Sequence, residues 1–333
     1  MTPKVSLTGI KPSGTPHIGN YFGAIKPALQ LVKDYEARYF IADYHALNTI
    51  RDAETLRNYT YDLAAVWLAC GLNPEKVLFY RQSDVPETFE LTTILMAFTS
   101  KGLMNRAHAY KAMVQENLEK GNDPDEGVNM GLFTYPVLMA ADILLFDTNV
   151  VPVGKDQKQH VEMTADIAKA VNYTYQQDLL VIPEPLISEG TQTIVGMDGR
   201  KMSKSYNNVI PLFLPSKNFR KTIMKIVTNS QSIEEPKDPE NCSVFALYKL
   251  FATAEEQTAM AERYRAGGMG WGEAKQALFE LMEREIAPLR EKYDDLINDR
   301  AYLDNVLKEG AEKARIIATA TIGRLRKATG IAR

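Results

Sequence analysis

A histidine in a turn of small residues is the first sign of chemistry in this sequence. Residues 8–21 read TGIKPSGTPHIGNY, in which prolines and glycines break an apolar run before a helical pattern begins. A turn that opens a helix presents free backbone N–H groups, and these bind anions. Gly14 and Gly19 would let a nucleotide approach that backbone, and His17 can donate a hydrogen bond to a phosphate oxygen. A tight turn with a helix-capping histidine is the other interpretation.

A second segment, at residues 195–208, places lysines in a loop rich in glycine and serine. It reads VGMDGRKMSKSYNN. Lys201 and Lys204 can follow the β- and γ-phosphates of a nucleotide and meet the charge that develops when pyrophosphate leaves. An exposed basic loop is the alternative. Because the five-residue match KMSKS accompanies the upstream turn, we favour a shared triphosphate site.

The elements that must position these segments alternate between strand and helix. Apolar runs and helical spacing predict strands at residues 5–9, 38–42, 77–80 and 150–153, and helices at residues 18–33, 56–70, 131–146 and 155–171. This alternation predicts a parallel sheet wrapped by helices, with ligands at the carboxyl ends of the strands. His17 and His45 follow two such ends. Beyond Pro211 the strand signal disappears, and helices are expected at residues 217–227, 245–251, 254–264, 272–293 and 301–328.

Composition narrows the class of protein. The 333 residues include 39 basic and 42 acidic side chains, giving a formal net charge of −3, so a nucleic acid would have to meet a local patch. Two distant cysteines exclude a disulfide framework and a cysteine-rich metal site. The N-terminus lacks a signal-peptide pattern, and no apolar run approaches the roughly 20 residues of a membrane span. We expect a soluble, cytoplasmic protein.

Two polar segments are expected at the surface. Residues 115–129, with GNDPDEG at their centre, predict a mobile loop. From Ala311 onward the chain is basic, and charge alone favours a solvated helix face. Contact with RNA phosphates is the competing hypothesis for this tail. Its charged residues are Glu312, Lys313, Arg315, Arg324, Arg326, Lys327 and Arg333.

The two phosphate segments resemble the paired motifs of the class I aminoacyl-tRNA synthetases. HIGN at residues 17–20 is similar to the family motif usually written HIGH, and KMSKS at residues 201–205 matches the second motif. Asn20 in the last place is a variant of the tryptophan and tyrosine branch. The stretches GIKPSGTPHIGNYFGA, ADYHAL, YPVLMAADILL and VPVGKDQKQH extend the resemblance to the tryptophan branch across the catalytic half, and the helical last third follows the family in layout.

The resemblance implies an ATP site shared by the two motifs, with His17, Lys201 and Lys204 as catalytic residues. Lys11 departs from the glutamine commonest in the family and would add a cation near the nucleotide. No carboxylate cluster identifies a protein-built metal site, and Mg²⁺ is expected on the phosphates. The implied ATP contacts are Lys11, Ser13, His17, Gly19, Asn20, Gly154, Asp156, Lys201, Met202, Ser203 and Lys204.

Asp142 is a lone charge in the apolar helix YPVLMAADILLF. Tyr135, Met139 and Asp142 share one helix face by their spacing, and an apolar patch ending in an acceptor suits an indole ring with its N–H donor. From the residues alone, pairing of Asp142 with a core arginine, lysine or tyrosine hydroxyl is favoured, because a buried carboxylate needs a partner. The resemblance reverses this preference, since it implies that the aspartate accepts the indole N–H.

The rest of the implied tryptophan site is dispersed along the chain. The resemblance gives Gln157 the substrate ammonium or carboxylate and places His45 at the indole pocket. His160 more often has a structural role, and we favour structural or surface roles for His108 and Lys111. The implied tryptophan contacts are Leu7, Gly9, His45, Tyr135, Met139, Asp142, Val153 and Gln157.

The expected architecture is α/β: a Rossmann-like catalytic domain at residues 1–190, the KMSKS loop at 191–208 and a helical anticodon-binding domain at 209–333. The expected reaction activates L-tryptophan with ATP and transfers it to tRNA(Trp). The family implies a homodimer, and no membrane is involved. Alternatives are a tyrosyl-tRNA synthetase, a nucleotidylyltransferase with a HIGH-like turn, and a non-catalytic RNA-binding synthetase paralogue. The intact His17, Lys201 and Lys204 argue against the last.

Overall fold

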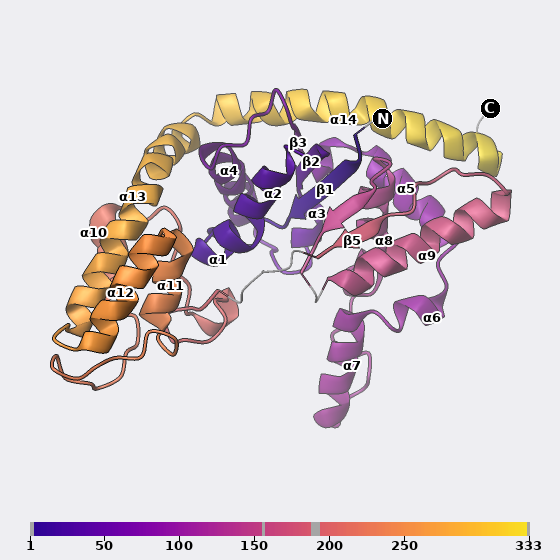
Figure 1. The fold of residues 1–333 in the computed structure, drawn as a ribbon. Helices are drawn as coiled ribbons and strands as arrows, with labels where there is room; N and C mark the ends of the chain where they lie inside the picture. The colour runs from indigo at the N-terminus through magenta and orange to yellow at the C-terminus, as the bar shows by residue number, and fades with distance from the viewer. Residues whose placement is uncertain (1–2, 155–156, 188–193, 332–333) are drawn as a thin grey trace.

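A five-stranded parallel sheet forms the centre of the protein (Figure 1). The computed structural model describes residues 3–154, 157–187 and 194–331. The strand order is β3-β2-β1-β4-β5, which confirms the predicted α/β class. Four strands were predicted, whereas the edge strand β5 was missed, because three residues that include Pro185 carry no apolar pattern. The strands are β1 (Val5–Ile10), β2 (Glu36–Ile41), β3 (Leu78–Arg81), β4 (Val150–Pro152) and β5 (Glu184–Leu186).

Alternate residues of the strands enter cores on opposite faces of the sheet, as strand geometry requires. On one face Tyr39 stacks on Trp67 of the helix α4 (Ala53–Ala69), with ring centroids 5.0 Å apart. On the other face Phe40 stacks on Tyr80 and shares an apolar core with the helices α5 (Glu87–Met96) and α8 (Met130–Leu144). Because both faces are covered, the central strands are rich in apolar residues, and this is why they could be predicted.

The helices around the sheet agree in most places with the predicted spans. Residues 18–31 form one helical run, with a π-helical turn at Tyr21–Ile25 between its α-helical ends. The helix α4 ends at Ala69, and Gly71 follows with a φ of 106°, a conformation that favours glycine. The helices up to β5 are α1 (Ile18–Asn20), α2 (Lys26–Leu31), α3 (Asp43–Ala46), α4 (Ala53–Ala69), α5 (Glu87–Met96), α6 (Lys101–Met104), α7 (His108–Glu119), α8 (Met130–Leu144) and α9 (Lys158–Tyr175).

The first part of the polar segment 115–129 is helical and is not a loop. The helix α7 continues to Glu119 and projects away from the sheet (Figure 1). The Asn117 side chain then donates hydrogen bonds to the carbonyl oxygens of Pro124 and Glu126, closing a compact turn. The prediction of a loop starting at residue 115 was therefore wrong in its boundary, because helix-compatible charged residues carry no apolar stripe.

Beyond residue 210, the described part of the chain contains helices and no strand, as predicted. A helical region of four helices comes first, and it shares one apolar core with α4 and with the residues that follow the KMSKS loop. The last helix, α14, leaves this region and runs back along the sheet domain (Figure 1). These helices are α10 (Ser216–Met224), α11 (Ser243–Phe251), α12 (Ala254–Ala266), α13 (Trp271–Asn298) and α14 (Arg300–Thr329).

The helix α14 approaches β3 so closely that only glycine fits at one position. A Cβ atom on Gly310 would lie 1.7 Å from the carbonyl oxygen of Phe79. Three arginines of this helix pair with the sheet domain: Arg315 with Glu87, Arg324 with Asp147, and Arg326 with Glu90. This pairing with acidic side chains is the alternative to RNA contact for these three arginines.

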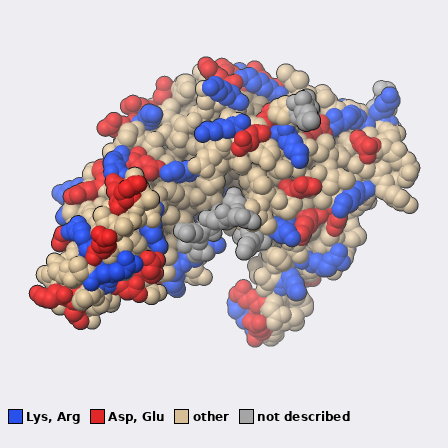
Figure 2. Space-filling view, in the orientation of Figure 1, with Lys and Arg blue, Asp and Glu red and all other residues tan. Residues whose placement is uncertain are grey.

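Charge is mixed over the visible surface. Figure 2 shows Lys and Arg side chains interspersed with Asp and Glu over the helical region and along α14. Among the described residues, no helix combines the length and the apolar character that crossing a membrane requires.

Candidate active site

The two phosphate segments lie side by side at the carboxyl end of β1, although they are far apart in the sequence. The residues that leave the KMSKS loop pair with the turn before α1: the Ile18 N–H donates to the Ile210 carbonyl at 2.9 Å, and the Leu212 N–H donates to the Pro16 carbonyl at 3.0 Å. His17 and Pro211 form a β-bridge between these bonds. The backbone therefore fixes the second motif against the first.

Side chains of the KMSKS loop then enter the first turn. The Gly19 N–H donates to Met202 Sδ at 3.2 Å, and Lys204 Nζ donates to the Ser13 carbonyl at 3.2 Å. Gly14 has a φ of 118°, and a Cβ there would lie 3.0 Å from Lys204 Nζ. A Cβ on Gly19 would lie 2.9 Å from His17 Nδ1. In this structure, both glycines leave room for side chains of the motifs themselves.

His17 is a neutral imidazole in this environment. The residue is 7% exposed, and its Nδ1 atom has no hydrogen-bond partner among the described residues. Burial, and then the charge of Lys204, lower the pKa of His17 to about 4. A neutral ring still donates from one nitrogen, so this histidine can bind a phosphate oxygen without being protonated first.

Lys204 is exposed over part of its length, but its ammonium group lies in a charged neighbourhood. Partial burial lowers the pKa of Lys204, and so does the nearby Lys11, whereas the carboxylate of Asp62 raises it. Lys11, Ser13 and Lys201 are exposed around this point. The site thus gathers positive charge at the carboxyl edge of the sheet, which suits an anionic ligand.

The other residues implied to contact ATP lie in the first turn, in the KMSKS loop and after β4. Asn20 accepts a hydrogen bond from the His17 N–H at 3.1 Å and so fixes the start of the helix. Ser203 is half-buried, and its Oγ shares a hydrogen bond with Ser205. Gly154 is half-buried after β4, and Asp156 lies outside the described residues.

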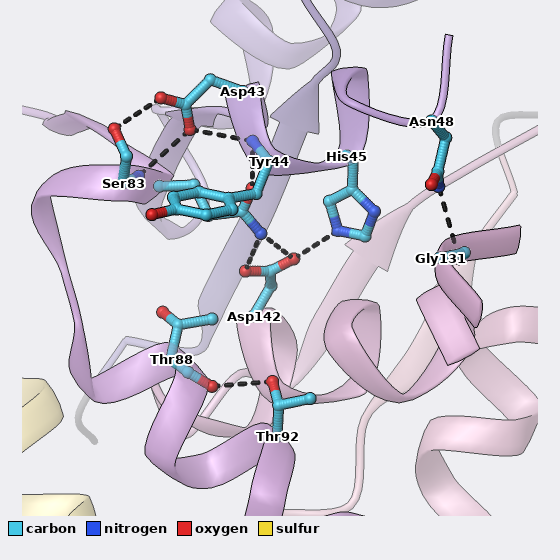
Figure 3. Close-up of polar contacts among 10 residues, drawn as sticks. Asp43, Tyr44, His45, Asn48, Ser83, Thr88, Thr92, Gly131 and Asp142 are labelled. Carbon is cyan, nitrogen blue, oxygen red and sulfur yellow. Dashed lines mark hydrogen bonds and ion pairs between the residues drawn. The ribbon is translucent and has the colours of Figure 1, made fainter. Parts of the chain in front are cut away.

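Asp142 is the centre of a second cluster, on the neighbouring strand ends (Figure 3). The residue is 3% exposed. Gln82 Nε2 donates to both of its carboxylate oxygens at 2.8 and 3.0 Å, and His45 Nε2 lies 2.8 Å from Oδ2. Burial raises the pKa of Asp142, while the hydrogen bonds from His45 and Gln82 oppose this rise. The expected partners, an arginine, a lysine or a tyrosine hydroxyl, are replaced by an imidazole and an amide.

An aromatic pair extends this cluster toward α9. The Tyr135 hydroxyl lies 2.6 Å from His160 Nε2, and the ring of Tyr135 meets His45 edge-on, with centroids 6.4 Å apart. Leu7 is buried in the adjoining core, against which Met139 and Val153 pack. Gly9 must lack a side chain, because its Cβ would lie 2.4 Å from the ring of Phe40. Gln157 is exposed at the start of α9.

Comparison with known proteins identifies the family. The family model described as tRNA synthetases class I (W and Y) matches residues 2–286. The tryptophan–tRNA ligase of Bordetella parapertussis is 52% identical over 328 residues, which are 98% of this chain and 72% of that protein. The tryptophan–tRNA ligase of Neisseria meningitidis is 48% identical over 99% of both chains.

The chain belongs to the tryptophanyl-tRNA synthetase family of class I tRNA synthetases. A solved structure of a family member from Campylobacter jejuni, complexed with ADP and tryptophan, has 44% sequence identity and a TM-score of 0.90, and covers 98% of this chain and 99% of its own. The resemblance seen in the sequence is therefore confirmed.

Two residues at the site of this synthetase were missed by sequence reasoning. Gln82, which holds Asp142, follows β3 directly and could have been found from the rule that site residues gather at strand ends. Asn208 is 2% exposed and organises the KMSKS loop by accepting from the Ser203 N–H and donating to the Lys201 carbonyl. No local pattern marks Asn208, because its partners belong to the loop that it folds.

Proposed function

We propose that this chain activates L-tryptophan with ATP and transfers it to tRNA(Trp), and that its two clusters divide this work. The observation that supports the division is the docking of Lys204 on the Ser13 carbonyl beside a neutral, buried His17, one strand away from the Asp142 cluster. The family membership agrees with this assignment.

In the first step, a tryptophan carboxylate oxygen bonds to the α-phosphorus of ATP. The bond from that phosphorus to the bridging oxygen breaks, and pyrophosphate leaves with the electron pair. Lys204 and Lys201 meet the negative charge on the departing group, and His17 donates a hydrogen bond to a phosphate oxygen. No covalent enzyme intermediate is formed, so positioning and charge stabilisation supply the catalysis.

Mg²⁺ enters this proposal as part of the substrate. Among the described residues, no group of three or more His, Cys, Asp or Glu side chains is arranged to hold a metal ion. Mg²⁺ favours phosphate oxygens and keeps several of its waters, so ATP carries it into the site.

The indole ring is recognised at the Asp142 cluster. Gln82 and His45 hold the carboxylate in one orientation and offset the cost of burying its charge. A carboxylate has about four lone-pair positions, so Asp142 can accept the indole N–H in addition to these two partners. Tyr135, Met139, Val153 and Leu7 supply apolar surface for the ring, and Gln157 binds the amino-acid end of the substrate.

In the second step, a terminal ribose hydroxyl of tRNA attacks the acyl carbon of tryptophanyl-adenylate, and AMP leaves. In this proposal the anticodon contacts come from the helical region α10–α13. The helix α14 is not assigned this role, because three of its arginines are paired with the sheet domain. The protein works in the cytoplasm as a homodimer, as its family resemblance implies.

Amino-acid-dependent exchange between ATP and pyrophosphate tests this function. Tryptophan should drive exchange, with tyrosine and phenylalanine far weaker, because only indole offers a ring N–H to Asp142. Equal exchange with tyrosine would overturn the tryptophan assignment. No exchange with any amino acid, despite tRNA binding, would favour a non-catalytic RNA-binding role.

A further inference from the structure

We propose that Asp43 is a positioning residue for tryptophan recognition, because its carboxylate joins the two strand-end segments that hold Asp142. One of these segments carries His45 and the other carries Gln82. The proposal rests on the function proposed above and deepens it, since it concerns specificity at the same site.

The two segments leave neighbouring strands at matching places. β2 and β3 are parallel and paired, and Ile41 stands opposite Arg81 at their carboxyl ends. Asp43 and Ser83 each follow two residues later. Equal spacing from a paired position brings these two residues to the same edge of the sheet. A link between them therefore sets the distance between the segments that follow the strands.

Asp43 makes this link with both of its carboxylate oxygens (Figure 3). Oδ1 accepts from the Ser83 N–H and from the Tyr44 N–H, each at 3.1 Å, and Oδ2 accepts from the Ser83 hydroxyl. Hydrogen bonds to an ionised acceptor are stronger than those between neutral groups. These three hydrogen bonds form the Asp43 clasp, which holds donors from both segments.

The clasp sets the orientation of the Gln82 amide. Gln82 is fully buried, and its Oε1 accepts from the Tyr44 N–H at 3.1 Å while its Nε2 donates to Asp142. A backbone N–H can only donate and a carboxylate can only accept. The reversed amide would therefore place two donors together at one end and two acceptors together at the other. The Tyr44 N–H, which the clasp holds, directs the amide donors to Asp142.

The clasp also positions His45. The helix α3 has four residues, which are too few to be stable without tertiary contacts. Asp43 is its first residue, and His45 is its third. Since the first residue is tied to Ser83, the imidazole is kept at its distance of 2.8 Å from Asp142 Oδ2.

The placement of both partners matters for the indole N–H. Gln82 donates to both oxygens of Asp142, and His45 lies against Oδ2. A carboxylate has about four lone-pair positions, so only those that these partners leave can accept from the substrate. The direction of the remaining positions depends on how the carboxylate is turned. Loosening the clasp should therefore weaken the binding of an indole more than that of a ring without an N–H donor.

The competing interpretation is that Asp43 only stabilises the edge of the sheet. Asp52 offers a matched control nearby, because its carboxylate accepts from the Thr55 N–H at 2.7 Å at the start of α4. This hydrogen bond caps one helix and joins no strand ends. Asp52→Ala should therefore lower stability, as the loss of a helix cap does, and leave recognition of the indole intact.

The test compares tryptophan with the analogue that has sulfur in place of the ring nitrogen, both in pyrophosphate exchange. Asp43→Ala should raise the KM for tryptophan about fivefold, a change of the size expected for one hydrogen bond. Its kcat and its KM for the analogue should change by less than about twofold, because ground-state recognition of the N–H is what is lost. Asp43→Asn keeps an acceptor for the two N–H groups and should recover most of the discrimination. Asp52→Ala should show the wild-type KM for both substrates with a lowered melting temperature.

A double-mutant cycle shows whether Asp43 acts through Gln82. In a Gln82→Met background, Asp43→Ala should raise the KM for tryptophan by less than about twofold further, because only His45 is left for the clasp to position. Effects of the two variants that multiply would overturn the proposal. An equal rise in KM for tryptophan and the analogue would overturn it too, as would a wild-type KM with a lowered melting temperature.

If Asp43→Ala does not fold, Ser83→Ala replaces it and removes one hydrogen bond of the clasp. It should lower the discrimination about threefold, and this effect should disappear in the Gln82→Met background. Wild-type discrimination by Ser83→Ala would contradict the proposal. Wild-type protein without tryptophan-dependent exchange would instead refute the proposed function, so the two failures are distinguishable.

Discussion

The region proposed to bind phosphate and the region proposed to bind indole are built in different ways. Each phosphate motif is a short continuous segment, and the backbone pairing of residues 16–18 with residues 210–212 brings the two together. The indole region instead takes one side chain from each of several elements: His45 from α3, Gln82 from the turn after β3, and Asp142 from α8. Phosphate binding uses backbone groups and flexible cations, which local sequence can encode. Recognition of one ring nitrogen needs a carboxylate held from several directions, and this is encoded only in the fold.

The strongest test of the comparison is at Asp142. Asp142→Ala should lose roughly 2–4 kcal/mol of transition-state binding for tryptophan, because it removes one partner of a buried, charged hydrogen bond. The measurement is kcat/KM in pyrophosphate exchange. A tryptophan analogue with sulfur in place of the ring nitrogen should lose little further in the variant. Equal discrimination against that analogue by wild type and variant would give Asp142 a purely structural role.

The corresponding test of the phosphate region is Lys204→Ala. Adenylate formation should slow by about a hundredfold or more, in the range for the loss of one preorganised charge-stabilising group. Tryptophan affinity without ATP, measured by calorimetry, should barely change, since the lysine meets phosphate. Lys217→Ala, an exposed lysine on α10, is the control. A tryptophan affinity that falls as much as the rate would mean that the two regions are not separable.

A smaller effect is expected at Gln82, which sequence reasoning missed. Gln82→Met keeps the length of the side chain and removes both amide donors from Asp142. We expect a loss of about 1–2 kcal/mol in kcat/KM for tryptophan, because a charged acceptor loses one of its partners. Gln276→Met, in the helical region, should have no effect. If Gln82→Met slowed adenylate formation without raising the KM for tryptophan, Gln82 would belong with the phosphate region.

The smallest effect is expected on α14. Arg324 and Arg326 already pair with Asp147 and Glu90. Neutralising Arg324, Arg326 and Lys327 together should leave the slope of log tRNA affinity against log salt unchanged. The free energy of unfolding should fall only slightly, because exposed ion pairs contribute at most about 1 kcal/mol each to stability. A slope that became shallower, with pyrophosphate exchange intact, would restore this helix as a phosphate-contact surface.

Much of the fold could be predicted, for a physical reason that also explains the failures. Strands buried on both faces, such as Val5–Ile10, consist of apolar and small, uncharged residues, so the sequence carries their signal. The edge strand Glu184–Leu186 is under no such constraint and was missed. In the proposed site, the motif residues were predicted from residue type and spacing. Gln82 was missed although it directly follows β3, because the carboxylate that it holds is contributed by a distant helix.

The return of α14 to the sheet has a consequence for how the chain is made. When synthesis has passed the helical region, both nucleotide motifs exist, yet the surface of β3 against which Gly310 will lie is still bare. This part of the sheet can therefore be covered only after α14 has been made, because the contact of Gly310 with Phe79 joins residues that are far apart in the sequence. A chain that lacks this helix would leave the apolar surface of the sheet against which α14 packs exposed to solvent.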